Sequence, residues 1–354
     1  MIDRVHKLIR HEQKPPTAVV DLLMRTLIGT NGTLYQLLDT KTKINDLQRP
    51  HFFFIERNGK AIGNLTICER EVILNGENTN SFYIRYFAFD TLFQGGSKKG
   101  QANSRFHQYF RAFFKTSNFN PVEPEYEKSV FWAFIDPENL RSFNMNERFG
   151  FQTIGQFQTT AFSRVKPQSH NVSRIQSEEK VEVLELIRKF YRDHQFFSPV
   201  HLFENDNYYI LRKNGEIVAG IQANPVAWQI KSLPGIMGKF LIKGAPYTPG
   251  IRKLINPKNH RFLATEGLFW GEGYEKEVEN LLEGVLALTN HHSMLIWTDT
   301  KDTHLNDLPI SWGLIQNMKK NNTVHVVAKF NGYSKEYVET LKSKSIYFSG
   351  FDMT

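Results

Sequence analysis

The hydrophobic and polar positions of the chain have helical spacing in some segments and strand spacing in others, and the same series occurs twice. Residues 17–28, TAVVDLLMRTLI, and 178–194, EEKVEVLELIRKFYRDH, have the apolar spacing of amphipathic helices. Each is followed by an aromatic-rich strand, an Asn-Gly pair and a second apolar strand: FFFIERNGKAIG at 52–63 and YYILRKNGEIVA at 208–219. An Asn-Gly pair in this setting predicts a β-hairpin, because both turn residues need a positive φ.

The later parts of the two halves correspond more weakly. The buried strand and turn SVFWAFIDPEN at 129–139 resemble HSMLIWTDT at 292–300, and residues 148–151 are echoed by 311–314. The polar segment VKPQSHNVS at 165–173 predicts a linker. We therefore expect an α/β protein with two domains of related plan, at residues 1–165 and 174–354.

The stretch NLRSFNMNERFGF, residues 139–151, predicts a short helix that stops at Gly150. Its apolar residues are roughly helical in spacing, and the residues between them are polar or charged. A glycine followed by an aromatic residue is typical of a left-handed helix C-cap with a hydrophobic anchor. The order of elements here is strand, Asn139, helix, Phe-Gly-Phe.

Composition excludes several classes of protein. With 40% hydrophobic residues in 354, the chain can form packed cores and is not globally disordered. It has no apolar run of about eighteen residues, so we expect no membrane span and no membrane partner. The N-terminus has no apolar signal region, and a single cysteine, Cys68, excludes a multi-cysteine zinc site. We expect a cytoplasmic protein without a metal.

The net formal charge of +8 permits an anionic partner. We interpret the lysines and arginines as scattered along the sequence and interleaved with acids, without a long basic stripe. We therefore do not expect nucleic acid as the main partner, because such binding normally needs a basic cluster on one face.

The first half resembles the GNAT superfamily of N-acyltransferases, which use acetyl-CoA or another acyl-CoA. The resemblance covers roughly residues 1–165 and implies domains that are each a mixed, mostly antiparallel twisted sheet flanked by helices. Its most specific part is the stretch at 139–151. The residues that follow the family pattern there are Asn139, Ser142, Met145, Glu147, Arg148, Gly150 and Phe151.

A second signature is the loop FQGGSKKGQANSRF at 93–106, which in the family opens a helix and binds the CoA pyrophosphate. Two registers are possible, starting at Gln94 or at Ser97; the second keeps both small positions and leads directly into a helix. Unpaired amides and the dipole at a helix N-terminus favour phosphate, although a basic glycine loop can also be merely solvated. The residues assigned to CoA on this basis are Lys98, Lys99, Gly100, Gln101, Ala102 and Asn103.

The resemblance also implies where the rest of the cofactor lies. In the family, the sheet splays after the preceding strand, and the pantetheine arm lies against it like an added strand. The backbones of Phe87, Ala88 and Phe89 would then bond the pantetheine amides, with Asn139 and Phe143 facing them. Alternating aromatic residues on a strand are by themselves more typical of a core.

The catalytic groups follow the family less closely. The helix position at which many members have an acidic Tyr holds Asn146, which has no titrating proton. The usual carboxylate on the central strand is missing, and Tyr83 lies near its place, although an unperturbed Tyr is a poor base. Glu69, Glu71 and Asp90 are alternative bases, each more typical of a surface carboxylate. Catalysis can also rest on proximity or have been lost.

The second half keeps the plan but alters the loop, FWGEGYEKEVENLL at 269–282. Its four glutamates crowd the helix start and would repel a pyrophosphate, so we interpret this half as a degenerate GNAT-like domain. The main hypothesis is an acyl-CoA-dependent transferase acting on a primary amine of a small molecule or peptide. An aminoacyl-tRNA-dependent transferase and a non-catalytic binding protein stay open, and the sequence defines no oligomeric state.

Overall fold

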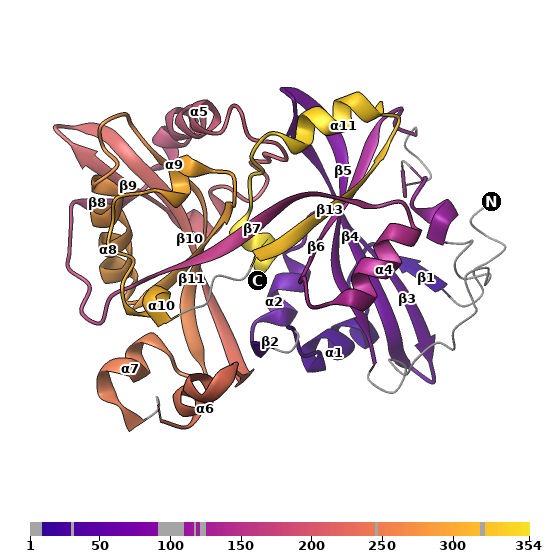
Figure 1. The fold of residues 1–354 in the computed structure, drawn as a ribbon, viewed down its shortest axis with the longest axis horizontal. Helices are drawn as coiled ribbons and strands as arrows, with labels where there is room; N and C mark the ends of the chain where they lie inside the picture. Colours follow the sequence, from indigo (N-terminus) through magenta and orange to yellow (C-terminus); the bar gives the residue numbers. More distant parts are fainter. Residues whose placement is uncertain are drawn as a thin grey trace.

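The protein is described by a computed structural model in which one twisted sheet of 13 strands runs through both halves of the chain (Figure 1). The structure describes residues 9–29, 32–90, 110–116, 118–120, 125–244, 247–318 and 323–354. Among the described helices, none is long and apolar enough to cross a membrane. The same residues contain no group of three or more His, Cys, Asp or Glu side chains placed to hold a metal ion.

The described residues of the first half form seven strands. They are β1 (Ile9–Glu12), β2 (Leu34–Leu37), β3 (Pro50–Arg57), β4 (Lys60–Leu74), β5 (Glu77–Phe89), β6 (Ser129–Ile135) and β7 (Gln152–Ser163). The helices described in this half include α1 (Thr17–Arg25), α2 (Thr40–Asn45) and α4 (Leu140–Arg148). The helices predicted at 17–28 and 139–151 are confirmed as α1 and α4.

The second half repeats this series. Its strands are β8 (Val172–Arg174), β9 (Tyr208–Lys213), β10 (Glu216–Ser232), β11 (His260–Trp270), β12 (Ser293–Asp299) and β13 (Thr323–Asn331). Its helices are α5 (Lys180–Phe190), α6 (Gly235–Gly244), α7 (Pro249–Leu254), α8 (Glu277–Thr289), α9 (Thr303–Asn306), α10 (Leu314–Met318) and α11 (Lys335–Lys342). Short 3₁₀ turns lie at Ser177–Glu179, Glu204–Asp206 and Gly350–Met353.

Both predicted Asn-Gly hairpins are confirmed. Asn58 and Gly59 join β3 to β4 with φ of 51° and 73°, and Asn214 and Gly215 join β9 to β10 with φ of 52° and 88°. A third hairpin of this kind, which the sequence analysis missed, joins β4 to β5 at residues 75–76. The signal was present there as the same Asn-Gly pair between apolar runs.

The two halves exchange strands. Along the sheet the order is β1-β3-β4-β5-β6-β13-β7-β12-β11-β10-β9-β8, so β13 of the second half lies between β6 and β7 of the first. In return, β7 pairs with β12 as well as with β13. The predicted fold class is confirmed, but each half is completed by a strand of the other. The domain boundaries at residues 1–165 and 174–354 stay a prediction.

The echo between residues 148–151 and 311–314 is not repeated in the structure. Gly150 ends α4, whereas Gly313 precedes α10. A Cβ on Gly313 would lie 2.2 Å from the carbonyl oxygen of Ser163 at the end of β7. The second glycine is therefore explained by a close approach to a strand as well as by its φ of 91°.

Candidate functional site

The sheet opens between β5 and β6. These two strands pair in parallel only where residues 80–83 face residues 129–132, although β5 continues to Phe89 and β6 to Ile135. Just beyond the pairing, Tyr86 has a φ of 50°, and the register of β5 with β4 shifts there. A bulge of this kind bends a strand away from its neighbour. Within the described residues, no strand pairs with the β6-facing edge of β5 beyond Tyr83.

A cavity of about 1870 Å³ adjoins this opening and is lined by both halves of the chain. From the first half it is lined by the part of β5 beyond its pairing with β6, the start of α4, and residues 26–29 and 32–33 between α1 and β2. From the second half it is lined by aromatic and aliphatic side chains of β10, β11 and β12. These include Trp228, Ile230, His260, Leu295 and Trp297. The last wall is formed by residues 352–354.

Most of the predicted site residues that the structure describes meet at this cavity. Those that line it are Tyr83, Phe87, Ala88, Phe89, Asn139 and Asn146. Phe143 does not; its ring packs edge-on against His325 of β13, with ring centroids 4.9 Å apart. The six loop residues from Lys98 to Asn103 lie outside the described part of the chain, so their role stays a prediction. Of the helix expected after that loop, Phe110 and Phe114 line the cavity.

Helix α4 presents Asn139 to the cavity and is fixed at both ends. The Asn139 side chain caps the helix, with its Oδ1 accepting from the Ser142 amide at 3.1 Å. At the other end, the amide of Phe151 donates to Asn146 and that of Gly150 donates to Glu147, each at 3.0 Å, which is a Schellman motif. Gly150 has the expected left-handed φ of 84°. The predicted C-cap is therefore confirmed.

Asn146 lines the cavity, but one end of its carboxamide is used in a hydrogen bond within its own helix. Its Nδ2 donates to the carbonyl of Ser142 at 2.8 Å, one turn earlier. The oxygen Oδ1 is therefore the atom of this side chain that is best placed to serve a ligand. As a hydrogen-bond acceptor, it can orient an amine or a thiol but cannot supply a proton.

Tyr83 is buried at the point where β5 and β6 part. Its hydroxyl donates to the carbonyl oxygen of Asp352 at 3.0 Å. Burial first, and the Asp352 carboxylate second, raise the pKa of Tyr83 well above its usual value. A phenol in this setting stays protonated, which is unfavourable for a general base. The catalytic role assigned to Tyr83 stays a prediction, and the contacts favour a positioning role.

Of the three alternative carboxylates, Glu71 is exposed as expected, and the other two are engaged elsewhere in the structure. Glu69 was expected at the surface and is instead 1% exposed, and its carboxylate accepts from Arg49 (3.0 Å) and from the Tyr126 hydroxyl (3.2 Å). Asp90 pairs with Arg25 of α1 at 3.0 Å. Neither lies among the residues that line the cavity.

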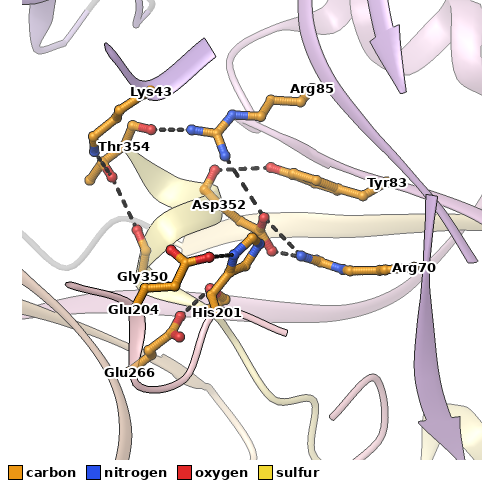
Figure 2. A network of polar contacts seen from close by, with 11 residues as sticks. Lys43, Arg70, Tyr83, Arg85, His201, Glu204, Glu266, Gly350, Asp352 and Thr354 are labelled. Atoms are coloured by element: carbon orange, nitrogen blue, oxygen red, sulfur yellow. Dashed lines mark hydrogen bonds and ion pairs between the residues drawn. The ribbon is translucent and has the colours of Figure 1, made fainter. Parts of the chain in front are cut away.

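A buried network of charges, which the sequence analysis missed, supports the cavity wall at residues 352–354 (Figure 2). Arg70 of β4 binds both carboxylate oxygens of Asp352, at 3.1 and 2.5 Å. Arg85 of β5 approaches the same carboxylate at 3.9 Å and donates to the carbonyl of Thr354. Burial disfavours both cations, but neighbouring groups, Asp352 among them, offset this, so the pKa of each arginine lies above its usual value.

Lys43 of α2 reaches the same turn and donates to the Thr354 hydroxyl, which in turn donates to the carbonyl of Gly350 at 3.2 Å. Burial, with a smaller contribution from the nearby Arg85, lowers the pKa of Lys43 to about 8 against the opposing effect of Asp39. Three cations from the first half thus hold the 3₁₀ turn Gly350–Met353 against the cavity. Nothing local in the sequence predicts these contacts, because their partners are more than 260 residues apart.

The corresponding opening in the second half is closed by the protein itself. Strands β11 and β12 pair in parallel only at Leu263 and Ala264, and Gly267 has a φ of 60° at the position equivalent to Tyr86. Beyond it, the Tyr208 hydroxyl donates to the Gly267 carbonyl at 2.7 Å, and the Tyr191 hydroxyl donates to that of Leu268 at 2.6 Å. These carbonyls of β11 are therefore already satisfied. This agrees with the interpretation of the second half as degenerate.

The glutamates at the start of α8 also have partners within the protein. Glu279 binds Arg164 at 2.6 Å, Glu277 binds Lys213 at 3.0 Å, and Glu275 accepts from the amide of Gly273 at 3.3 Å. Carboxylates that neutralise cations and a loop amide leave little positive potential for a phosphate group.

Comparison with known proteins places the fold. No family model and no curated protein matches the sequence. Two crystal structures of N-myristoyltransferase from Saccharomyces cerevisiae with bound myristoyl-CoA align over 96% of this chain and 88% and 86% of theirs, each at 10% identity, with TM-scores of 0.54 and 0.55. A GCN5-related N-acetyltransferase from Anabaena variabilis aligns over 95% of this chain and 74% of its own, at 9% identity and a TM-score of 0.47. By its strand topology and by the two yeast structures, the chain has a tandem GNAT-like fold, the fold of N-myristoyltransferase.

Proposed function

We propose that the protein is an acyl-CoA-dependent N-acyltransferase that transfers an acyl group from the thioester to a primary amine. The observation that carries the proposal is the edge of β5 beyond Tyr83, with which no strand pairs among the described residues, beside a cavity of about 1870 Å³. An unpaired strand edge binds an extended chain of amides through main-chain hydrogen bonds. Pantetheine is such a chain, and the backbones of Phe87, Ala88 and Phe89 are the groups that would bind it.

Two further observations support one acyl-CoA site per chain. The yeast N-myristoyltransferase with the same fold was crystallised with myristoyl-CoA. The equivalent edge in the second half is occupied by the hydroxyls of Tyr191 and Tyr208. The loop residues Lys98 and Lys99 keep their proposed role at the pyrophosphate.

The length of the acyl group is part of the proposal to be tested. Acetyl-CoA is the donor suggested by the sequence. The cavity is larger than the roughly 300–1,000 Å³ that is usual for small ligands, so it has room for longer acyl groups or for a peptide acceptor.

In the reaction, a neutral amine attacks the thioester carbonyl, the C–N bond forms and the C–S bond breaks, and the amine proton leaves to a base while the thiolate is protonated. Asn146 can accept a hydrogen bond from the amine or the thiol through Oδ1. Tyr83 would act by positioning, since its hydroxyl holds the cavity wall at Asp352. Such positioning of the two reactants can lower the barrier by roughly 7–11 kcal/mol.

The proposal is tested first by thermal shift with CoA, acetyl-CoA and acyl-CoAs of increasing chain length, with uncharged and aminoacylated tRNA as further arms. Donors that stabilise the protein are then incubated with a panel of amines and peptides, and thiol release and acylated product are measured. We expect stabilisation by acyl-CoA and release of one thiol for each amide formed. Binding without turnover would favour the non-catalytic alternative, and a response to aminoacyl-tRNA alone would favour the tRNA-dependent one.

A further inference from the structure

One segment of the chain carries nearly all of its net charge. Residues 217–265 contain seven lysines and arginines and no aspartate or glutamate, in a chain whose net formal charge is +8. The expectation that basic residues are scattered among acids is therefore wrong for this segment. The seven residues are Lys231, Lys239, Lys243, Arg252, Lys253, Lys258 and Arg261.

These residues lie together at one margin of the molecule. They follow the end of β10, helices α6 and α7, and the start of β11, and the two helices lie beyond the ends of those strands (Figure 1). All seven side chains are exposed, and none forms an ion pair with any residue that the structure describes. We name the described part of this segment, residues 231–244 and 247–261, the basic lobe.

The basic lobe also exposes large apolar side chains. Phe240 of α6 is 60% exposed and Tyr247 is 86% exposed. Phe240 lies between Lys239 and Lys243 in the helix sequence GIMGKFLIKG. Exposed aromatic and aliphatic groups flanked by lysines are typical of helices that lie in a membrane interface, where the rings enter the acyl boundary and the cations meet the headgroups.

We propose that the basic lobe docks onto the surface of an anionic lipid bilayer. Charge complementarity favours this partner, because seven exposed cations that form no ion pair with a described residue, in a segment without acids, gain from the negative potential of acidic lipids. The exposed Phe240 and Tyr247 favour a bilayer over duplex nucleic acid, whose phosphate contacts leave such rings in water. This is a peripheral contact and needs no membrane-spanning helix.

Docking has a consequence for the cavity, although it does not rest on the proposed acyl transfer. Leu233, Ile255 and His260 belong to the basic lobe and also line the cavity. A bilayer held by α6 and α7 therefore lies next to one wall of the cavity. A substrate with a lipid tail could pass between the two without crossing water.

The test is co-sedimentation of the full chain with vesicles, measured without acyl-CoA. Vesicles of neutral phosphatidylcholine are compared with vesicles that also contain about 30% phosphatidylglycerol, whose anionic surface attracts basic residues. We expect binding to the anionic vesicles that weakens as salt rises. The double variant Lys239→Glu/Lys243→Glu should lower the partition coefficient by at least about 25-fold, and Phe240→Ser by about tenfold.

Matched controls alter the same charge and apolar area elsewhere. Lys189→Glu/Lys335→Glu changes two exposed lysines of α5 and α11, and Val181→Ser removes an apolar side chain that is 74% exposed. Both controls should bind vesicles like the unaltered protein. Equal loss in the controls, equal binding to neutral vesicles, or binding to tRNA with no binding to vesicles would each overturn the proposal.

Discussion

The buried carboxylate of Asp352 provides the sharpest test of how the cavity wall is held. Asp352→Asn keeps the size of the side chain and removes its charge. Arg70 and Arg85, which are 7% and 5% exposed, then remain as buried cations without their shared carboxylate. The hydrogen bond from Tyr83 is retained, because it goes to the main-chain oxygen of residue 352.

The expected loss follows from the number of cations left uncompensated. Breaking a buried pair by removing one partner typically costs about 3–5 kcal/mol. Here one substitution affects two guanidinium groups, so we expect the free energy of unfolding to fall by at least about 3 kcal/mol. That is a large fraction of the roughly 5–15 kcal/mol by which native proteins are stable.

Urea unfolding followed by circular dichroism measures this effect as a lower midpoint at an unchanged slope. The matched control is Asp193→Asn, which removes an exposed carboxylate paired with Arg192 at 3.3 Å and should cost less than about 1 kcal/mol. A loss below about 1 kcal/mol in Asp352→Asn, equal to the control, would show that water solvates the arginines and that the network does not hold the wall.

Three further predictions follow from the site. Gly150→Val should destabilise by at least about 1–2 kcal/mol because φ is 84°, whereas Gly150→Asn should cost less; matching urea midpoints would refute this. Tyr83→Phe should lower stability by about 1 kcal/mol and turnover less than tenfold; a loss of 10² or more in rate would make Tyr83 a general acid or base. Burial lowers the pKa of His260 to about 4, so its unfolded form binds the proton first and stability should fall by up to about 2–3 kcal/mol as pH drops from about 6.5 to 4. Urea unfolding of His260→Gln at the two pH values should show a smaller fall, and an equal fall would contradict the assignment.

Local signals predicted the elements of this fold well. The Asn-Gly pairs fixed two hairpins because their turn geometry depends on two residues only. The helix at 139–151 was recognised from its spacing and from Gly150, whose C-cap is also a local property. The position of Asn139 at the cavity follows from the strand and helix on either side of it.

The interactions that build the cavity could not be predicted in this way. The exchange of β7 and β13 depends on which edge each strand meets, and the apolar pattern of a strand does not specify its neighbour. The contact of Arg70 with Asp352 joins residues 282 positions apart, and neither has a neighbour in sequence that indicates the other. Phe143 was assigned to the cofactor from the family resemblance, and its contact with His325 could not be foreseen because β13 comes from the other half.

The basic lobe was not predicted from the sequence for a different reason. Its seven cations were visible in the sequence, but averaging charge over the whole chain concealed the absence of acids between residues 217 and 265. The exposure of Phe240 and Tyr247 could not be read from the sequence, because the same apolar spacing is typical of a helix buried against the sheet.

The central claim is that acyl-CoA lies against the edge of β5 beyond its pairing with β6. Hydrogen–deuterium exchange with and without a bound acyl-CoA tests it most directly. Amides of residues 86–89 should exchange more slowly in the complex, whereas those of residues 267–270 in β11, whose edge is closed by Tyr191 and Tyr208, should be unchanged. Protection confined to β11, or tight binding of acyl-CoA with no protection at residues 86–89, would contradict the account.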